Sequence, residues 1–474
     1  MRVTWVQPED LIRHELWQSA AEGRDVSRQA AAWAAAGGAD GPPRAGASPE
    51  WGSAEQRDLA GRLLLELDDL PNDSDTEPSD WQAILATLPR QGAAPAQHTE
   101  RAGDDVTRSP SAPSGDRLLG AWIGRAVGCV LGKPVEKVPR EGIEAILRST
   151  GRWPLNRYFT AVGLDDEVAS RWPWNRASRT TSLEENLDGT PEDDDLNYTL
   201  LALKIVETYG RDFGAEDVAQ AWLLDLPAGR TFTAERVAYR NLLEGVTPPQ
   251  TARVRNPFRE WIGAQIRTDL YGWINPGRPL AAAEMAYRDA SVSHTRNGLY
   301  GAMFVAAAAS EAVLGSEVDT ILDVATAVVP PASRLAKAIR LGRELAESGT
   351  APTEAYVVLE REFEGMHWVH SVNNTALVGY ALQAGAGDFD ASIGLTVTGG
   401  WDTDSNGATV GALLGARNGA QQIADHWTEP LAGRMSSSIP AMERVSFSDA
   451  AARTEALLQR AEIDEQVADP TGTR

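Results

Sequence analysis

Apolar residues recur three and four positions apart along most of the chain, which is the spacing of one face of an α-helix. Many of these segments are built from Ala, Leu, Glu and Arg, which are strong helix formers. Alternation of apolar and polar residues over four to eight positions, as in a strand, is scarce. The pattern predicts helices over residues 117–130, 196–209, 215–226, 234–244, 281–291, 298–314, 332–347, 369–384 and 406–416. We therefore expect an all-α fold with these helices in one large domain.

Composition divides the chain into an accessory region, a linker, a main domain and a tail. These parts cover residues 1–90, 91–115, 116–465 and 466–474, respectively. The first part shows helical spacing over 9–36, 56–67 and 81–88, around a loop rich in Gly, Pro, Ala and Ser at 37–53. The second part has almost no large apolar side chain, so it cannot bury enough surface to offset its ordering entropy, and we expect it to be flexible. The tail is expected to be disordered.

The chain is acidic, with 67 Asp and Glu against 44 Lys and Arg among 474 residues, a net charge of −23. This balance argues against a nucleic-acid partner, because binding phosphates relies on clustered basic residues. A single cysteine, Cys129, excludes a disulfide within the chain. No apolar run reaches the roughly 18 residues of a membrane span, and no basic segment followed by an apolar run opens the chain. We expect a cytoplasmic protein that does not bind membranes; its oligomeric state is not indicated.

The segment at 399–415, G-G-W-D-T-D-S-N-G-A-T-V-G-A-L-L-G, begins with glycines and acids and continues as a small-residue helix. Asp402, Asp404 and Ser405 place oxygen atoms at the helix start, and such oxygens suit Mg²⁺, Ca²⁺ or Mn²⁺. An ordinary helix cap explains Asp or Ser there equally well. An EF-hand is excluded because its twelfth position requires glutamate, and Leu413 occupies it.

A second acidic helix start contains three consecutive aspartates, Asp193, Asp194 and Asp195. Acids in a first helical turn are favoured by the unpaired amide groups and the helix dipole, so capping is again the simple interpretation. Three adjacent carboxylates repel one another, however, and a cation would relieve that repulsion. Together with the acids at 402–405, they supply enough oxygens for two metal ions.

Glycines recur every fourth residue ahead of a loop that contains Glu136. They are Gly120, Gly124, Gly128 and Gly132. A bare helix face of this kind either approaches a ligand or packs tightly against another helix, and tight packing is the favoured interpretation.

Three segments resemble the ADP-ribosylglycohydrolase family, in the family's order. Residues 128–136, G-C-V-L-G-K-P-V-E, resemble a G-D-A-L-G-x-P-x-E motif, and residues 193–198, D-D-D-L-N-Y, resemble T-D-D-T-Q-M. Residues 399–416 resemble G-G-D-T-D-T-x-x-A-x-x-G-A-x-x-G-A. The resemblance covers the chain from about residue 116 onward. It implies an all-helical fold, two Mg²⁺ or Mn²⁺ ions, and hydrolysis of the N- or O-glycosidic bond between ADP-ribose and an acceptor.

The resemblance also implies roles for individual residues. The implied metal ligands are Asp193, Asp194, Asp195, Asp402, Asp404 and Ser405, with Asp193 in place of a ligating threonine. Glu136 matches a glutamate that reaches the metals and helps catalysis. Residues 263–267, G-A-Q-I-R, resemble a substrate loop, which makes Gly263, Ala264 and Arg267 candidates for substrate binding, and His294 matches a histidine that touches the ribose or pyrophosphate.

Three departures from the family pattern lie in these motifs. Cys129 stands where many members have aspartate, Leu196 replaces a threonine, and Trp401 is inserted before the first aspartate of the last motif. Losing a carboxylate and a hydroxyl changes the hydrogen bonds that tune metal affinity. Trp401 stacks on a base, narrows the pocket, or is a core aromatic.

The residues favour a metal-dependent glycosidase in which Glu136 steers a water molecule or protonates the leaving group. Two alternatives stay open: a hydrolase of a small N-riboside or a nucleotide-derived ligand, and a protein that binds ADP-ribose without cleaving it. The chain has no H-E-x-x-H, G-x-S-x-G or G-x-x-x-x-G-K-[ST] motif, which argues against zinc proteases, serine hydrolases and P-loop enzymes.

Overall fold

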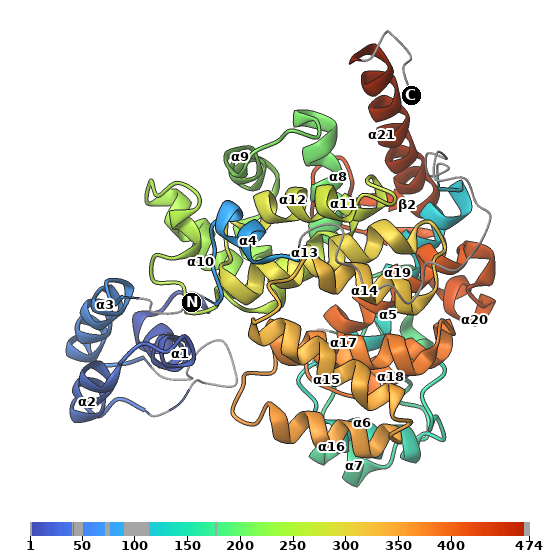
Figure 1. Ribbon diagram of the computed structural model, residues 1–474. Helices are drawn as coiled ribbons and strands as arrows, with labels where there is room; N and C mark the ends of the chain where they lie inside the picture. Colours follow the sequence, from blue (N-terminus) through green and yellow to red (C-terminus); the bar gives the residue numbers. More distant parts are fainter. Residues whose placement is uncertain are drawn as a thin grey trace.

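A computed structural model describes residues 2–39, 41, 51–71, 76–89, 113–175 and 178–468, without the side chains after residue 460. The chain is mostly helical, which confirms the all-α expectation (Figure 1). The N-terminal helices are α1 (Pro8–Ala21), α2 (Ser27–Ala35), α3 (Ala54–Asp68) and α4 (Trp81–Thr87). Most of the segment expected to be a linker lies outside the described residues.

The main domain begins with a long helix and continues through short connections. Its first helices are α5 (Gly115–Gly132), α6 (Arg140–Ser149), α7 (Asp166–Arg171), α8 (Asp194–Tyr209), α9 (Ala215–Asp225), α10 (Thr233–Leu243), α11 (Asp269–Trp273) and α12 (Pro279–Ala290). They are followed by α13 (Arg296–Ala312), α14 (Val318–Ala327), α15 (Arg334–Glu347), α16 (Pro352–Glu362), α17 (Ser371–Gly385), α18 (Phe389–Thr398), α19 (Thr403–Asn418), α20 (Asp425–Thr428) and α21 (Phe447–Ala468). A small antiparallel hairpin joins β1 (Arg434–Ser436) to β2 (Arg444–Ser446).

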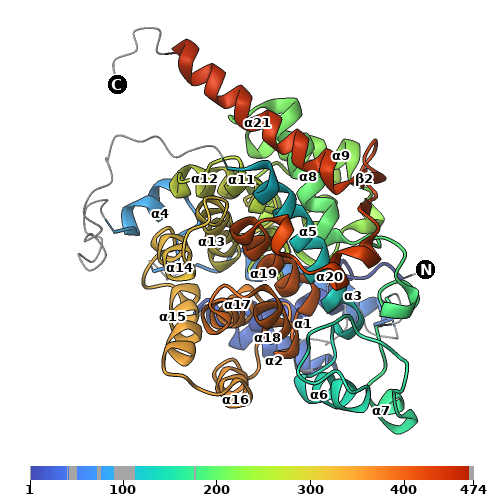
Figure 2. The same ribbon diagram turned by 90° about the vertical axis from the view of Figure 1, so that its right-hand side faces the viewer.

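Helix α21 extends outward from the body of the domain, as both ribbon views show (Figures 1 and 2). It is anchored near its start, where the Trp122 indole donates to Thr454 Oγ1 at 3.1 Å. The helix continues to Ala468, so residues 466–468 of the expected tail are helical, and residues 469–474 lie outside the described part.

The centre of the domain is a backbone-to-backbone contact between α5 and α19. A Cβ atom added at Gly120, Gly124 or Gly128 would overlap a carbonyl oxygen of α19, at Gly415, Gly411 and Gly407 respectively. The partner residue number falls as the α5 number rises, so the two helices run antiparallel. This contact confirms tight packing as the reason for the glycine repeat. The segment Gly115–Val135 is apolar and long enough to cross a membrane by length and composition alone, but 89% of its 18-residue apolar window is buried within the protein.

The N-terminal region is joined to the main domain by buried ion pairs. Arg259 contacts Glu15 at 2.7 Å and Glu22 at 2.7 Å, and all three side chains are almost fully buried. Glu77, just before α4, contacts Arg296 at 2.5 Å and Arg334 at 2.9 Å. Residues far apart in sequence therefore form one continuous interior.

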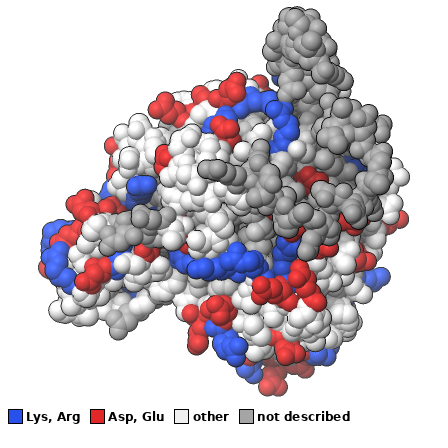
Figure 3. Space-filling view, viewed as in Figure 1, with Lys and Arg blue, Asp and Glu red and all other residues white. Residues whose placement is uncertain are grey.

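Charge on the surface is mixed. On the face shown in Figure 3, Asp and Glu gather at several separate places, and Lys and Arg form a band across the middle. On that face the acidic excess is spread out and not concentrated in one patch.

We expect Gly124→Ala to lower the stability of the protein by about 2 kcal/mol or more, because neither backbone at this contact can yield to a methyl group. Thermal or denaturant unfolding measures the change. Gly61→Ala in α3 is the matched control: no atom lies within 4 Å of its added Cβ, so this variant is expected to be unchanged or more stable by up to about 1 kcal/mol. Equal effects of the two substitutions would contradict this account of the helix contact.

Replacing Arg259 by Met is expected to cost roughly 3 kcal/mol or more, since it leaves Glu15 and Glu22 buried without their cation. The comparison is Arg28→Ala, which breaks an exposed pair with Glu66 and is expected to cost less than about 1 kcal/mol. The melting temperatures of the two variants show whether the contact between the N-terminal region and the main domain stabilises the fold. Similar melting temperatures would show that the region is only loosely attached.

Candidate functional site

The antiparallel helix contact brings two acidic segments together at one end of the α5–α19 pair. Glu136 lies just after the end of α5. Asp402 is at the N-cap position of α19 but its side chain makes no capping hydrogen bond, and Asp404 is in the first turn of that helix. One carboxylate oxygen from each of these residues lies within 4.8 Å of the others. Asp402 and Asp404 are buried, whereas the Glu136 side chain is 18% exposed and so faces the accessible side of the group. We call Glu136, Asp402 and Asp404 the first acid group.

The loop before α19 is held in place by amide and hydroxyl groups. Asn374 Oδ1 accepts hydrogen bonds from the Asp402 backbone N–H at 3.2 Å and from Asn406 Nδ2 at 2.6 Å. Thr403 Oγ1 donates to the Gly132 carbonyl at 2.8 Å, which ties the start of α19 to the end of α5. Trp401 has φ 61°, a conformation that bulky residues rarely adopt. Several contacts therefore hold a strained turn that aims Asp402 at the site.

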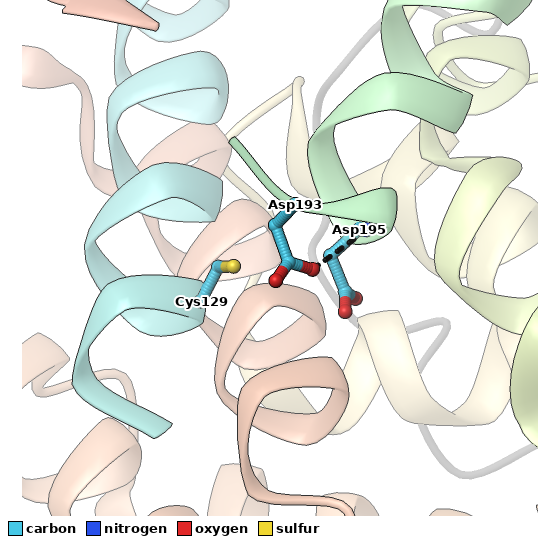
Figure 4. Close-up of side chains that lie close together, drawn as sticks. All are labelled: Cys129, Asp193 and Asp195. Atoms are coloured by element: carbon cyan, nitrogen blue, oxygen red, sulfur yellow. Dashed lines mark hydrogen bonds between the residues drawn. The ribbon is translucent and has the colours of Figure 1, made fainter. Parts of the chain in front are cut away.

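A second acid group lies beside the first and contains Cys129, Asp193 and Asp195, again with ligand atoms within 4.8 Å of one another. Figure 4 shows the Cys129 thiol pointing toward Asp193, with both aspartates at the start of α8. Asp193 Oδ1 caps α8 by accepting the Asp195 N–H at 3.0 Å. Arg125 is fully buried and donates to the Asp195 carbonyl at 2.7 Å and to Asp269 at 2.7 Å, so α5 fixes the position of this turn.

Lys133 enters the second acid group from the end of α5. Its ammonium forms a very short ion pair with Asp193 Oδ2 and donates to the Glu192 carbonyl at 2.7 Å. Burial lowers the pKa of Lys133, but the charge of Asp193 outweighs it, and the net direction is upward. Burial likewise disfavours ionised Asp193, yet Lys133 holds the pKa of Asp193 below its ordinary value. Asp193 is therefore both a helix cap and the partner of a lysine.

The pKa values of the other acids are raised because these carboxylates are buried close to one another. Burial raises the pKa of Asp404 to about 7, with a further contribution from Glu136. Burial, followed by the neighbouring Asp404, raises the pKa of Asp402, and burial followed by Asp193 raises the pKa of Asp194 and Asp195. A hard dication would reverse these shifts, since oxygen ligands of this kind are those it prefers. The first acid group fits such an ion.

Two implied ligands lie at the edge of this arrangement. Ser405 Oγ donates to Asp195 Oδ2 at 3.4 Å, so the hydroxyl lies between α19 and α8. Asp194 is half-buried and belongs to neither acid group. Their roles as metal ligands stay predictions.

The implied substrate residues Gly263, Arg267 and His294 meet at one side chain, Glu235. A Cβ at Gly263 would overlap the Glu235 carboxylate, Arg267 contacts it at 2.7 Å, and His294 Nε2 lies 3.9 Å from it. Burial, and then the charge of Arg267, lowers the pKa of His294, so this imidazole is neutral at pH 7.

Arg267 is fully engaged within the protein. Besides Glu235, its guanidinium donates to Asp289 Oδ1 at 2.5 Å and to Ser293 Oγ at 3.0 Å. Ala264 is buried in the same short helix, η5 (Ile262–Arg267). The four implied substrate residues thus form a buried structural unit, and their direct contact with substrate stays a prediction.

Trp401 is half-buried, with its ring 6.1 Å from that of Phe363. It lines a cavity of about 180 Å³ together with Lys137, Arg140, Glu360 and Trp368. Lys137 connects this cavity to the first acid group, because its ammonium lies 2.9 Å from Glu136 Oε1. The aromatic side chains of Trp368 and Trp401 therefore lie beside the candidate metal ligands.

Sequence reasoning missed several polar residues that shape the site. Asn175 donates to Glu136 Oε2 at 2.6 Å, and Asn374, Arg125 and Lys133 hold the acidic loops as described above. Only Lys133 carried a local signal, since it lies inside the motif that ends at Glu136. The others come from distant segments and become visible only when the chain is folded.

The chain is similar to known proteins over most of its length. A model of the ADP-ribosylglycohydrolase family matches residues 110–462. An uncharacterized protein of Archaeoglobus fulgidus is 26% identical over 325 residues, covering 67% of this chain and 92% of that protein. A solved structure titled ADP-ribosylglycohydrolase-related protein complex covers 73% of this chain and 98% of its own, at 20% identity and a TM-score of 0.43, which is too low to add to the argument. Because the family match spans well over half of the sequence and contains both acid groups, the chain belongs to the ADP-ribosylglycohydrolase family.

Proposed function

We propose that the protein hydrolyses the glycosidic bond between ADP-ribose and an acceptor, as a glycosidase that depends on a divalent cation, Mg²⁺ or Mn²⁺. The observation that carries the proposal is the convergence of Glu136, Asp402 and Asp404 within 4.8 Å. Three carboxylates held this close, two of them buried, are poorly stable without a cation between them. Hard oxygen ligands favour Mg²⁺ or Mn²⁺ over softer metals.

Cleavage at the ribosyl C1 atom proceeds through an oxocarbenium-like state, so the site must hold the sugar and present water to C1. When bound, a dication supplies a Lewis acid that orients hydroxyl groups and makes water more acidic. The residues of this chain supply the rest. The carboxylates of Asp402 and Asp404 supply the negative charge that holds the cation. Hydrogen bonds made by Asn374 and Thr403 keep the loop that carries them in place.

Glu136 is the proposed catalytic residue because it is the most exposed carboxylate of the first acid group. Asn175 donates to one carboxylate oxygen at 2.6 Å, and Lys137 lies 2.9 Å from the other. These contacts orient the carboxylate. In this position Glu136 takes a proton from the attacking water or delivers one to the leaving group.

A second candidate function is hydrolysis of a small N-riboside, and the cavity beside Trp401 favours it. Its volume of about 180 Å³ is below the roughly 300 Å³ at which pockets for drug-sized ligands begin. Trp401 and Trp368 offer aromatic surface that suits a flat acceptor or base. Comparing arginine-, serine- and DNA-linked ADP-ribose with free nucleosides as substrates distinguishes the two functions. Tight binding of ADP-ribose with no turnover of any substrate would instead indicate a binding protein.

Glu136→Gln is expected to lower kcat by about 100-fold or more while metal binding persists, because the amide keeps the shape but cannot transfer the proton. Release of ADP-ribose is measured with Mg²⁺, Mn²⁺ or EDTA, alongside bound metal. The comparison variant, Asp402→Asn combined with Asp404→Asn, is expected to lose both metal and activity. An unchanged kcat in Glu136→Gln would remove Glu136 from the mechanism.

Asp404 is expected to make the metal-free protein less stable as the pH rises from about 4 to about 7. The pKa of Asp404 is about 7 in the folded chain, above its ordinary value, so the folded state holds a proton that the unfolded state has already released. Melting temperatures in EDTA across this range measure the effect. Asp404→Asn is expected to flatten the slope, and Mg²⁺ or Mn²⁺ to restore stability at pH 7.5. If wild type and Asp404→Asn show the same change of melting temperature with pH in EDTA, this account of Asp404 is wrong.

A further inference from the structure

The two acid groups differ in what already balances their charge. In the first group, the described part of the chain places no Lys, Arg or His within 4 Å of the Asp402 or Asp404 carboxylates. Lys137 pairs with Glu136 at 2.9 Å and lies over the Trp368 ring, and its side chain is 51% exposed, so water screens much of its charge. The described residues therefore form no ion pair with Asp402 or Asp404, and burial keeps the pKa of Asp404 raised to about 7 despite the influence of Lys133.

In the second group, the cation is part of the chain. The Lys133 ammonium is paired with Asp193 Oδ2 and anchored by the Glu192 carbonyl at 2.7 Å, with its side chain only 10% exposed. Arg125 Nη2 lies 3.7 Å from Asp195 Oδ1 on the other side. A dication placed among Cys129, Asp193 and Asp195 would approach two fixed positive charges in a buried setting, where repulsion is poorly screened.

The donor atoms of the second group also suit a hard ion poorly. Asp193 has both oxygens in use, one on Lys133 and one on the Asp195 N–H. Cys129 is fully buried and offers sulfur, which Mg²⁺ and Mn²⁺ bind less well than oxygen. Within this group, Asp195 and the Ser405 hydroxyl next to it offer the oxygen atoms that remain, and Asp194 is not part of the group.

We propose that the protein binds one divalent cation, in the first acid group with Asp402 and Asp404 as its ligands, and that the Lys133 ammonium takes the place of a second. The inference rests on the proposed function only in assuming that the first acid group binds metal. It departs from the resemblance, which implies two ions. Lys133 replaces the second ion in two respects: it joins the end of α5 to the start of α8, and it offsets the charge of Asp193. Unlike a metal ion, it cannot exchange or be removed by a chelator.

The test starts from protein stripped of metal and measures how many Mn²⁺ ions each chain then binds, by calorimetric titration and by electron paramagnetic resonance. Wild type is expected to bind one Mn²⁺ per chain, and Asp404→Asn to lose most of that binding. Lys133→Met is nearly the same size but uncharged, so it frees Asp193 and is expected to admit a second Mn²⁺. Lys133→Arg keeps the charge and is expected to stay at one.

Lys137→Met is the matched control for removing a lysine near the acids, and its stoichiometry is expected to stay at one. Two Mn²⁺ ions in wild type would overturn the proposal, and so would a folded Lys133→Met variant that still binds one. If Lys133→Met does not fold, the number of Mn²⁺ ions bound by wild type decides whether the proposal holds. Wild type that binds no Mn²⁺ would overturn the proposed metal dependence as well, an outcome distinct from a count of two.

Discussion

The site depends on the direct contact between the backbones of α5 and α19. Because Gly120, Gly124 and Gly128 lack side chains, the carbonyl groups of α19 approach α5 more closely than any larger residue would permit. The two helices run antiparallel, so the last turn of one meets the first turn of the other. Glu136 and Lys133 are thereby set beside Asp402 and Asp404. A looser helix pair would move these groups apart and leave the carboxylates without a common ion.

Electrostatic balance is the second constraint on this interior. The acids at the starts of α8 and α19 are buried, and burial disfavours their charged forms. The chain offsets part of this charge with Lys133 and Arg125, each of which also bridges two helices. Asp402 and Asp404 form no ion pair with the described residues, and this is where we propose that an ion from solution binds. The same principle joins the N-terminal region to the domain, where Arg259 and Arg334 neutralise buried glutamates.

Much of the fold could be predicted from the sequence because helix formation is local. The expected helices over 117–130 and 406–416 correspond to α5 and α19, with ends shifted by a few residues. The glycine repeat indicated close packing but not its partner, which lies almost 300 residues away. Asp193 had two interpretations, cap and ligand, and local sequence could not choose between them. Its contact with Lys133 depends on where α5 ends in relation to α8, which no local pattern encodes.

The sequence by itself determined the all-α class, the acidic helix starts and the resemblance to a glycohydrolase family, since each depends on residues that are close together in the sequence. Only the tertiary structure decided which acids share a group, that Gly263, Arg267 and His294 meet at Glu235, and that a lysine occupies one of the two acid groups. The reason is physical. Helix propensity and capping act over a few residues, whereas ion pairing and metal coordination depend on distances of a few ångströms between segments far apart in the chain.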